Sequence, residues 1–255
     1  MARVTACVLQ KGGTAKTTTA CALGAGLLRR GHRVLMVDTD PQGNLTYGMG
    51  ADAGGGGLFE ALSGEPLGGL VQRMPRGDIV ASSPRLVGAD KIFTDIGMEY
   101  LLAEALAGVM DCYDYIIVDC PPQLGVLTVN ALVASSDIII PVTSDVYSMQ
   151  GLSQLFGSIE KIRRRANSGL MIDGILLTRY SGRSVLSRDL KEAIEARAAD
   201  MGTRVYGTVI REGVAVRESQ ARRVSIFDYD PGSNQAKDYD NFVREYLGEG
   251  SGGNV

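Results

Sequence analysis

The sequence predicts a doubly wound α/β fold, in which a mostly parallel sheet carries helices on both faces. Apolar strand patterns alternate with helical patterns along most of the chain, and residues 33–38 (R-V-L-M-V-D) are apolar almost throughout. Alternation of this kind is typical of βαβ units, and continuous apolar runs are typical of strands covered on both faces. Ligands of such sheets bind at the carboxyl ends of the strands.

The first βαβ unit is the clearest part of the pattern. A strand is expected at residues 4–9, a helix at 17–30, where Gly31 ends it, and a second strand at 33–38. Further strands are expected at residues 115–119, 137–142, 171–178 and 204–209. Helices are expected at about residues 97–110, 124–134, 147–166 and 185–199, with a last helix at about 235–247.

Length and composition favour one globular domain. The 255 residues are 45% hydrophobic and 22% charged, which excludes disordered and fibrous classes. We expect a single domain over residues 1–247 and a disordered tail over 248–255. No stretch approaches the ~18 apolar residues of a membrane span, and no signal peptide pattern opens the chain, so we expect a cytoplasmic protein.

Cysteine and histidine usage excludes several kinds of site. The four cysteines lack any C-x-x-C pair and lie in apolar patterns, so we expect small buried hydrophobes rather than disulfides or metal ligands. These cysteines are Cys7, Cys21, Cys112 and Cys120. His32 is the single histidine, which excludes histidine-based metal sites and Ser-His-Asp triads.

Charge is distributed unevenly along the chain. The formal net charge is −3, yet residues 161–223 hold 14 basic against 7 acidic residues, a net of +7. The remainder holds 12 basic and 22 acidic residues, a net of −10. A basic segment in an acidic protein indicates a face that binds a polyanion. Charge alone leaves a set of solvated helix faces as an equal alternative.

A glycine-rich segment joins the first strand to the first helix, and it reads Lys11-Gly12-Gly13-Thr14-Ala15-Lys16-Thr17-Thr18. This context is typical of a phosphate-binding loop, whose backbone N–H groups and helix N-terminus hold phosphate oxygens. Lys16 would reach the β- and γ-phosphates, and the Thr17 hydroxyl would coordinate Mg²⁺.

Two residues depart from the usual G-x-x-x-x-G-K-[ST] pattern of such loops. Lys11 precedes the first glycine, and Ala15 stands where glycine usually precedes the closing lysine. A positive φ at Ala15 would cost on the order of 1–2 kcal/mol, whereas a negative φ would make alanine harmless.

With its extra lysine, the loop resembles the deviant Walker A motif of the ParA/MinD superfamily. Three further segments are similar to ParA proteins: the D-T-D-P-Q-G-N run that begins at Asp38, the Walker B-like strand ending D-C-P-P, and the late V-I-R-E-G-V run. The stretch around residues 150–155 is similar as well. The resemblance covers residues 4–247, and it implies a small ParA protein without an N-terminal helix-turn-helix.

The resemblance implies an ATPase that uses ATP and Mg²⁺, slow alone and stimulated by a partner. Asp119 and Thr17 would hold Mg²⁺. Cys120 follows Asp119 where a conventional strand-type ATPase might place the glutamate base, so another carboxylate must serve. The family points to Asp40 for the attacking water, whereas Asp38 would assist Mg²⁺ through water or hold the loop.

The family's adenine contacts fall near residues 178–179 and 210–212. They make Thr178 and Arg211 candidates for nucleotide binding, in addition to the phosphate loop.

The family also implies the partners. Lys11 would reach the nucleotide of a second subunit in an ATP-dependent homodimer, where it would act as a catalytic residue in trans. Double-stranded DNA would bind without sequence preference, the nucleoid would be coated, and a ParB-like protein would stimulate hydrolysis. The expected DNA contacts are Arg179, Arg183, Arg188, Arg217, Arg222 and Arg223. Arg163, Arg164 and Arg165 are better explained as a helix-end cluster.

Three alternatives stay open from the sequence. The protein could position a cargo other than plasmid or chromosomal DNA, or it could be a metabolic P-loop enzyme that uses ATP on a small acceptor. Membrane binding of the MinD kind is disfavoured, because the last helix carries Asp238, Asp240 and Glu245 among its aromatic residues. We expect that helix to pack on the core.

Overall fold

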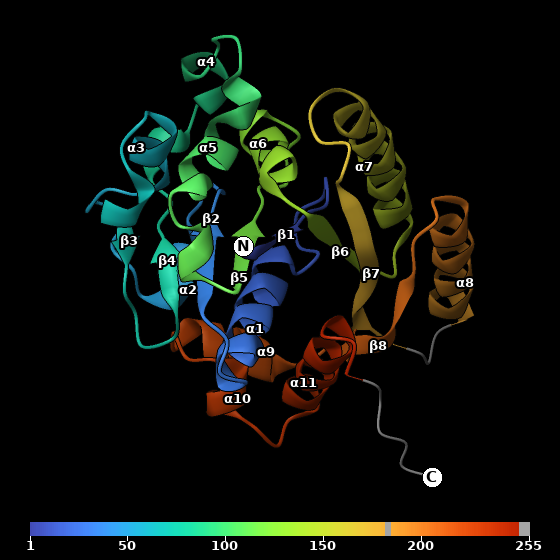
Figure 1. Ribbon diagram of the computed structural model, residues 1–255. Coiled ribbons are helices and arrows are strands. Elements are labelled where there is room, and N and C mark those ends of the chain that lie inside the picture. The colour runs from blue at the N-terminus through green and yellow to red at the C-terminus, as the bar shows by residue number, and fades with distance from the viewer. Residues whose placement is uncertain (182–184, 250–255) are drawn as a thin grey trace.

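A computed structural model describes residues 1–181 and 185–249 of the chain. One eight-stranded sheet has the order β3-β4-β2-β5-β1-β6-β7-β8, and helices cover both of its faces (Figure 1). Its strands are β1 (Arg3–Cys7), β2 (Val34–Asp38), β3 (Val71–Gln72), β4 (Asp78–Val80), β5 (Tyr115–Asp119), β6 (Asp137–Thr143), β7 (Met171–Tyr180) and β8 (Val205–Arg211). The pairs are parallel except β3 with β4, so the predicted fold class is confirmed.

Two apolar cores lie on opposite faces of this sheet. One packs against α1, α2, α9, α10 and α11, and the other against α3, α4, α5, α6, α7 and α8. The helices are α1 (Lys16–Arg29), α2 (Asn44–Met49), α3 (Leu58–Leu62), α4 (Ala89–Ile92), α5 (Leu101–Ala107), α6 (Val126–Ala134), α7 (Val146–Arg165), α8 (Val185–Asp200), α9 (Val214–Ala221), α10 (Ile226–Tyr229) and α11 (Asn234–Tyr246). Short 3₁₀ turns occupy Leu67–Gly69, Pro84–Leu86, Met98–Tyr100 and Met110–Cys112.

Strand order determines where the functional segments meet. β5 lies between β2 and β1, and the register pairs Asp119 with Asp38 on one side and with Cys7 on the other. Because these strands are parallel, the two carboxylates and the loop that follows β1 lie at the same edge of the sheet.

The expected elements agree with the structure to within a few residues, with two kinds of difference. The helix expected at 97–110 is a 3₁₀ turn followed by α5, which ends at Ala107. Seven short elements were not expected, namely β3, β4, α2, α3, α4, α9 and α10. Each has two to eight residues, which is too few to show a clear hydrophobic period.

The last helix packs on the core as expected. Tyr239, Phe242, Val243 and Tyr246 of α11 are buried against α1 and the sheet. Across residues 1–181 and 185–249, no helix combines the length and apolar character that a membrane crossing requires. The cysteine expectation is confirmed for Cys7 and Cys120, whereas Cys112 is exposed because it lies in a surface turn.

Gly57 at the start of α3 provides a test of the packing. Its backbone is extended, but a Cβ there would lie 2.2 Å from the carbonyl oxygen of Ala81, which already accepts the Leu58 N–H. We therefore expect Gly57→Ala to lower the free energy of unfolding by about 2 kcal/mol or more. Denaturant unfolding measures this change.

Gly157, on the exposed side of α7, is the matched control because a Cβ there meets no atom within 4 Å. Gly157→Ala should raise stability by about 0.5–1 kcal/mol. Equal effects of the two substitutions would contradict the assigned packing of α3 on β4.

Candidate nucleotide-binding site

The loop between β1 and α1 has the backbone of an anion-binding site. Gly13 and Ala15 both have left-handed φ values, 76° and 67°, and α1 begins at Lys16 directly after them. No side chain caps this end of α1 and no acidic residue lies in its first turn. Its N–H groups are therefore free to bind an anion, and the helix dipole favours negative charge there.

Lys16 points back onto the loop rather than into solvent. Its ammonium donates a 2.9 Å hydrogen bond to the carbonyl oxygen of Lys11, and the residue is 7% exposed. Burial lowers the pKa of Lys16, although the nearby Asp119 carboxylate acts in the opposite direction. A phosphate placed over the loop would give this buried ammonium the anionic partner that it lacks.

A cavity of about 470 Å³ opens above the loop. Its volume falls in the range of small-molecule sites, roughly 300–1,000 Å³. All six residues from Gly12 to Thr17 line it, as do Asp40 from the segment after β2 and Pro122 from the segment after β5. The remaining lining residues are Thr18, Cys21, Gln42, Asn44, Tyr47, Gly48, Gln220 and Ala221.

Two carboxylates, Asp38 and Asp119, are completely buried beside the loop. Asp38 accepts hydrogen bonds from the Thr46 backbone and hydroxyl, each at 2.7 Å, and from the Asp40 N–H. Neither oxygen of Asp119 has a hydrogen-bond partner among the described residues. Burial raises the pKa of Asp38 to about 6, and burial together with Asp38 raises the pKa of Asp119 well above its ordinary range.

An unpartnered buried carboxylate of this kind fits a cation. The described part of the chain has no cluster of three or more His, Cys, Asp or Glu that could enclose a metal by itself. Mg²⁺ in nucleotide sites needs no such cluster, because phosphates and waters supply most of its ligands. Asp119 and the Thr17 hydroxyl are the residues that would hold it.

Asp40 occupies a different position from Asp38. It lies on the cavity wall, and its Oδ1 accepts a 3.0 Å hydrogen bond from the Gln42 N–H. Its backbone carbonyl accepts a hydrogen bond from the Ser82 hydroxyl, which fixes the segment. This placement supports Asp40 for the attacking water and a loop-holding role for Asp38.

Lys11 is held by the start of α7. Its ammonium lies 2.5 Å from both carboxylate oxygens of Asp145 and 3.1 Å from the Ser148 hydroxyl. Although partial burial opposes ionisation of Asp145, hydrogen bonds from Lys11 and Thr143 lower its pKa to about 2. In this conformation Lys11 points away from its own loop cavity, which its side chain does not line.

The structure does not bring Thr178 and Arg211 to the cavity wall. Thr178 is buried and donates hydrogen bonds to the carbonyl oxygens of Thr14 and Val142, so it supports the loop from behind. Arg211 is bound by Asp238, with a shortest contact of 2.6 Å. Neither side chain faces the cavity in this conformation.

Tyr47 and Gln220 line the cavity but were not expected there. Gln220 in α9 donates a 2.9 Å hydrogen bond to the Thr18 hydroxyl, across 202 residues of sequence. Tyr47 in α2 is 55% exposed and carries the Arg223 guanidinium 4.1 Å from its ring centre. No motif marks either residue. Gln220 is brought to the loop only by the tertiary fold, and Tyr47 lies in a helix of six residues, too short to show a hydrophobic period.

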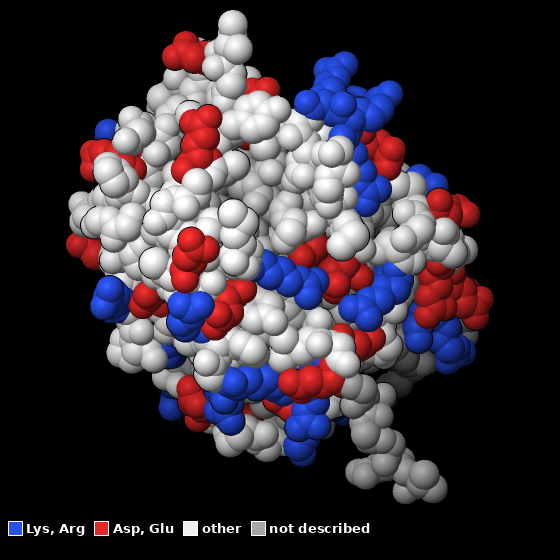
Figure 2. Space-filling model, viewed as in Figure 1, with Lys and Arg blue, Asp and Glu red and all other residues white. Residues whose placement is uncertain are grey.

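Three of the six expected DNA-contacting arginines lie in α9 or directly after it. Arg217, Arg222 and Arg223 have no carboxylate ion-pair partner among the described residues, whereas Arg179 pairs with Glu212 at 2.8 Å. Arg188 lies in α8, and Arg183 lies outside the described residues. Figure 2 shows a second compact basic group at one end of α7, where Arg163, Arg164 and Arg165 form the last turn as expected.

Comparison with known proteins identifies the family. A family model described as an AAA domain matches residues 2–172. The sporulation initiation inhibitor protein Soj of Bacillus subtilis is 37% identical across 98% of this chain and 100% of its own length. The chromosome-partitioning ATPase Soj of Thermus thermophilus is 38% identical across 93% of this chain and 92% of its own length.

The chain belongs to the ParA family of the ParA/MinD superfamily. The resemblance carried by its motifs is thereby confirmed, and with it the ATPase class.

A solved structure extends this result. Cobyrinic acid a,c-diamide synthase from Mycobacterium smegmatis superposes with a TM-score of 0.84 and 33% identity, covering 100% of this chain and 97% of the other. That protein has also been solved with bound ADP and magnesium and with an ATP analog and magnesium. Both complexes agree with the expected cofactors, ATP and Mg²⁺.

The left-handed backbone of Ala15 generates a first prediction for the site. Ala15→Gly removes the contact between Cβ and backbone that a positive φ imposes, so we expect a gain of about 0.5–1 kcal/mol in unfolding free energy. Ala25→Gly, inside the right-handed helix α1, should instead lose about 1 kcal/mol. Equal signs in denaturant unfolding would contradict the φ of Ala15.

The buried acid pair generates a second prediction. In nucleotide-free protein, Asp119→Asn should raise stability by about 1–2 kcal/mol, or Tm by about 3–6 °C, because it removes a carboxyl group whose ionisation burial opposes. A carboxyl group whose folded pKa lies above its unfolded pKa loses stability as pH rises between the two values. The gain should therefore be larger at pH 8 than at pH 5, and a destabilised variant at pH 8 would contradict the assignment.

Proposed function

We propose that this ParA-family ATPase segregates plasmid or chromosomal DNA. In this proposal the protein binds Mg-ATP, forms a homodimer, binds double-stranded DNA without sequence preference, and is released when a ParB-like partner stimulates hydrolysis. The observation that carries the proposal is the position of α9. Its last residues, Gln220 and Ala221, line the same cavity as the phosphate loop, and Arg217, Arg222 and Arg223 lie in α9 or directly after it. The two Soj relatives, one of which is named as a chromosome-partitioning ATPase, support the cellular role.

In this proposal each residue around the loop has a separate role in hydrolysis. Free N–H groups of the loop and the N-terminus of α1 bind the phosphates, and the Lys16 ammonium moves from the Lys11 carbonyl to a phosphate oxygen. Thr17 and Asp119 hold Mg²⁺, which neutralises charge on the phosphates. Asp40 orients the attacking water and accepts its proton.

Lys11 has the role of joining two subunits. Its reach across the dimer requires the ammonium to leave Asp145 and to pair with the phosphates of the second subunit. The exchange replaces one charge-assisted contact with another, so its cost is small. Dimerisation thereby depends on nucleotide, and it doubles the number of cations presented to DNA.

DNA binding would depend on phosphate contacts alone. Arg217, Arg222 and Arg223 are exposed on and beside α9, and Arg179 and Arg188 extend the set. Contacts of this kind release counterions, so the affinity falls steeply with salt. We propose a cytoplasmic, nucleoid-associated protein on this basis.

The main alternative is a metabolic P-loop enzyme, the class to which the name of the M. smegmatis synthase belongs. Such an enzyme would show turnover that depends on a small acceptor, and its function would not require DNA binding by the arginines in and after α9. A protein that positions a cargo other than DNA would share the proposed biochemistry and differ in its partner.

Binding to an arbitrary DNA duplex tests the proposal. We expect tight binding with a slowly hydrolysed ATP analog, weak binding with ADP, and a loss of about 10³-fold or more in affinity between 50 and 200 mM salt. The paired variant Arg217→Ala and Arg222→Ala should reduce the slope of log K against log salt by about 4, because it removes two cations from each subunit of the dimer. Fluorescence anisotropy measures both.

Arg204→Ala is the matched control, because Arg204 is bound to Asp173 at the other end of β8. It should leave the salt slope unchanged. Absence of DNA binding at low salt in every nucleotide state would reject the partitioning function in favour of the small-acceptor enzyme.

A further inference from the structure

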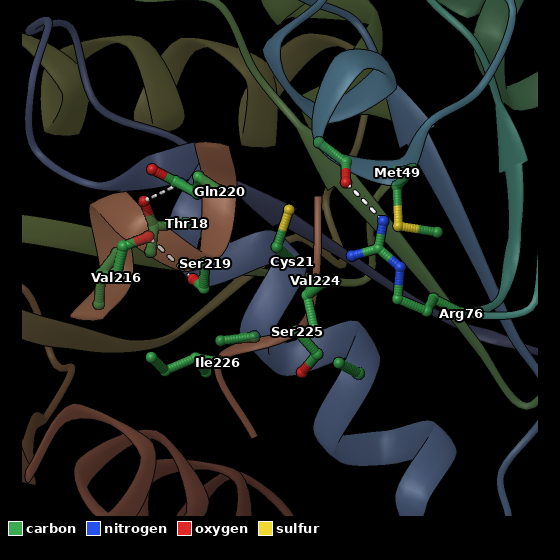
Figure 3. A pocket seen from close by; sticks show the side chains of 13 residues that line it. Thr18, Cys21, Met49, Arg76, Val216, Ser219, Gln220, Val224, Ser225 and Ile226 are labelled. Atoms are coloured by element: carbon green, nitrogen blue, oxygen red, sulfur yellow. Dashed lines mark hydrogen bonds between the residues drawn. The ribbon is translucent and has the colours of Figure 1, made fainter. Parts of the chain in front are cut away.

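Helix α9 is attached to the nucleotide cavity at its C-terminal end, and a hydrogen bond from the Tyr229 hydroxyl to Glu218 joins it to α10. Among its eight residues, only Ala215 and Ser219 are buried. A cavity of about 50 Å³ separates it from α1 and α2 (Figure 3). Cys21 and Met49 face this space from one side and Val216 from the other. A helix above a void has fewer dispersion contacts, so it can shift at low cost.

Two contacts fix the end of α9 to the nucleotide loop. Gln220 donates its hydrogen bond to the hydroxyl of Thr18, which belongs to the first turn of α1 (Figure 3). Arg223 stacks on Tyr47, which follows the segment that contains Asp40. The contacts thus join α9 to the phosphate loop and to the segment after β2 separately.

The turn that ends α9 orients Arg223 toward Tyr47. Arg223 has a left-handed φ of 54°, and the described residues contain only two other non-glycine residues with positive φ, Ala15 and Arg179. This conformation is common directly after a helix, and backbone hydrogen bonds from Arg223 to Gln220 and from Val224 to Ser219 hold it here. The turn places the Arg223 guanidinium over the Tyr47 ring.

A nucleotide in the cavity would touch both attachments. The phosphates would lie over the N–H groups at the start of α1, and Gln220, Ala221 and Tyr47 line the same cavity. A ligand shifts a conformational equilibrium only by contacting its states differently. A nucleotide that contacts Gln220 or Ala221 of α9 would meet this requirement, because those contacts change when α9 moves.

We propose that α9 is the element that transmits nucleotide occupancy to the DNA-binding face. Bound nucleotide fixes the end of α9 through Gln220 and the Tyr47–Arg223 stack, and α9 then holds Arg217, Arg222 and Arg223 in one arrangement. Without nucleotide, α9 shifts over the cavity and the arrangement is lost. The effect on DNA rests on the proposed DNA-binding function, whereas the nucleotide-dependent motion of α9 does not require DNA.

The test combines Tyr47→Leu with Gln220→Leu in the full chain. The matched control is Tyr229→Leu, because Arg222 lies over the Tyr229 ring at 5.2 Å and Tyr229 does not line the nucleotide cavity. Amide hydrogen exchange is measured over residues 214–224 with and without a saturating, slowly hydrolysed ATP analog and Mg²⁺. DNA affinity is measured at saturating analog and at saturating ADP.

We expect nucleotide to slow exchange in α9 by about tenfold in the wild type and in Tyr229→Leu, and by less than about twofold in the double variant. The ratio of DNA affinities with analog and with ADP should fall in the double variant by about tenfold or more. Because every site is occupied at saturating nucleotide, a substitution that weakens nucleotide binding does not change these two results.

The outcomes separate this inference from the function on which it rests. An α9 response in the wild type that persists unchanged in the double variant, or no response in the wild type, overturns the coupling role of α9. The wild type could instead show the α9 response, lose it in the double variant, and bind no DNA in any nucleotide state. That result supports the coupling role of α9 and rejects the partitioning function.

Discussion

The structure depends on Asp119, a buried carboxylate whose oxygens have no hydrogen-bond partner among the described residues. Asp119 ends the strand between β1 and β2, and the parallel register places it against Asp38 and beside the phosphate loop. Each group is fully buried, and the three donors around Asp38 leave none for Asp119. A charge in this position is tolerated because the site is built for a cation and a nucleotide that carries it.

The other features of the site follow from the same need for a ligand. Lys16 is buried against a carbonyl oxygen, Lys11 is held by Asp145, and the start of α1 has no capping side chain. Lys16 and the start of α1 have an internal partner weaker than the one a phosphate would provide, or none, whereas Lys11 has a charged partner that it can exchange for a phosphate. The nucleotide-free protein therefore keeps unfavourable contacts that ligand binding relieves, and this difference is the free energy available for conformational change.

The sequence predicted the fold well because its main elements are long and its loop motif has a fixed context. Lys16 and Thr17 were predicted from the loop motif, Asp119 from its position at a strand end, and Asp40 from the family resemblance. The structure places all four at the same edge of the sheet, since strand ends in a parallel sheet converge. Gln220 could not be found in this way, because α9 returns to the loop across 202 residues and has only eight residues itself. Tyr47 lies in α2, whose six residues are too few to show a hydrophobic period. Thr178 supports the loop from behind, a distinction that depends on side-chain direction and not on the motif.

The central claim is that Asp119 carries a raised pKa until a cation reaches it. Carbon-13 NMR of the aspartate side-chain carboxyl groups, titrated between pH 4 and pH 9, measures this directly. The account predicts two aspartates that titrate well above the usual ~3.9 in the nucleotide-free protein and that become fully ionised at neutral pH on addition of Mg-ADP. Ordinary titration of every aspartate in the nucleotide-free protein would contradict it.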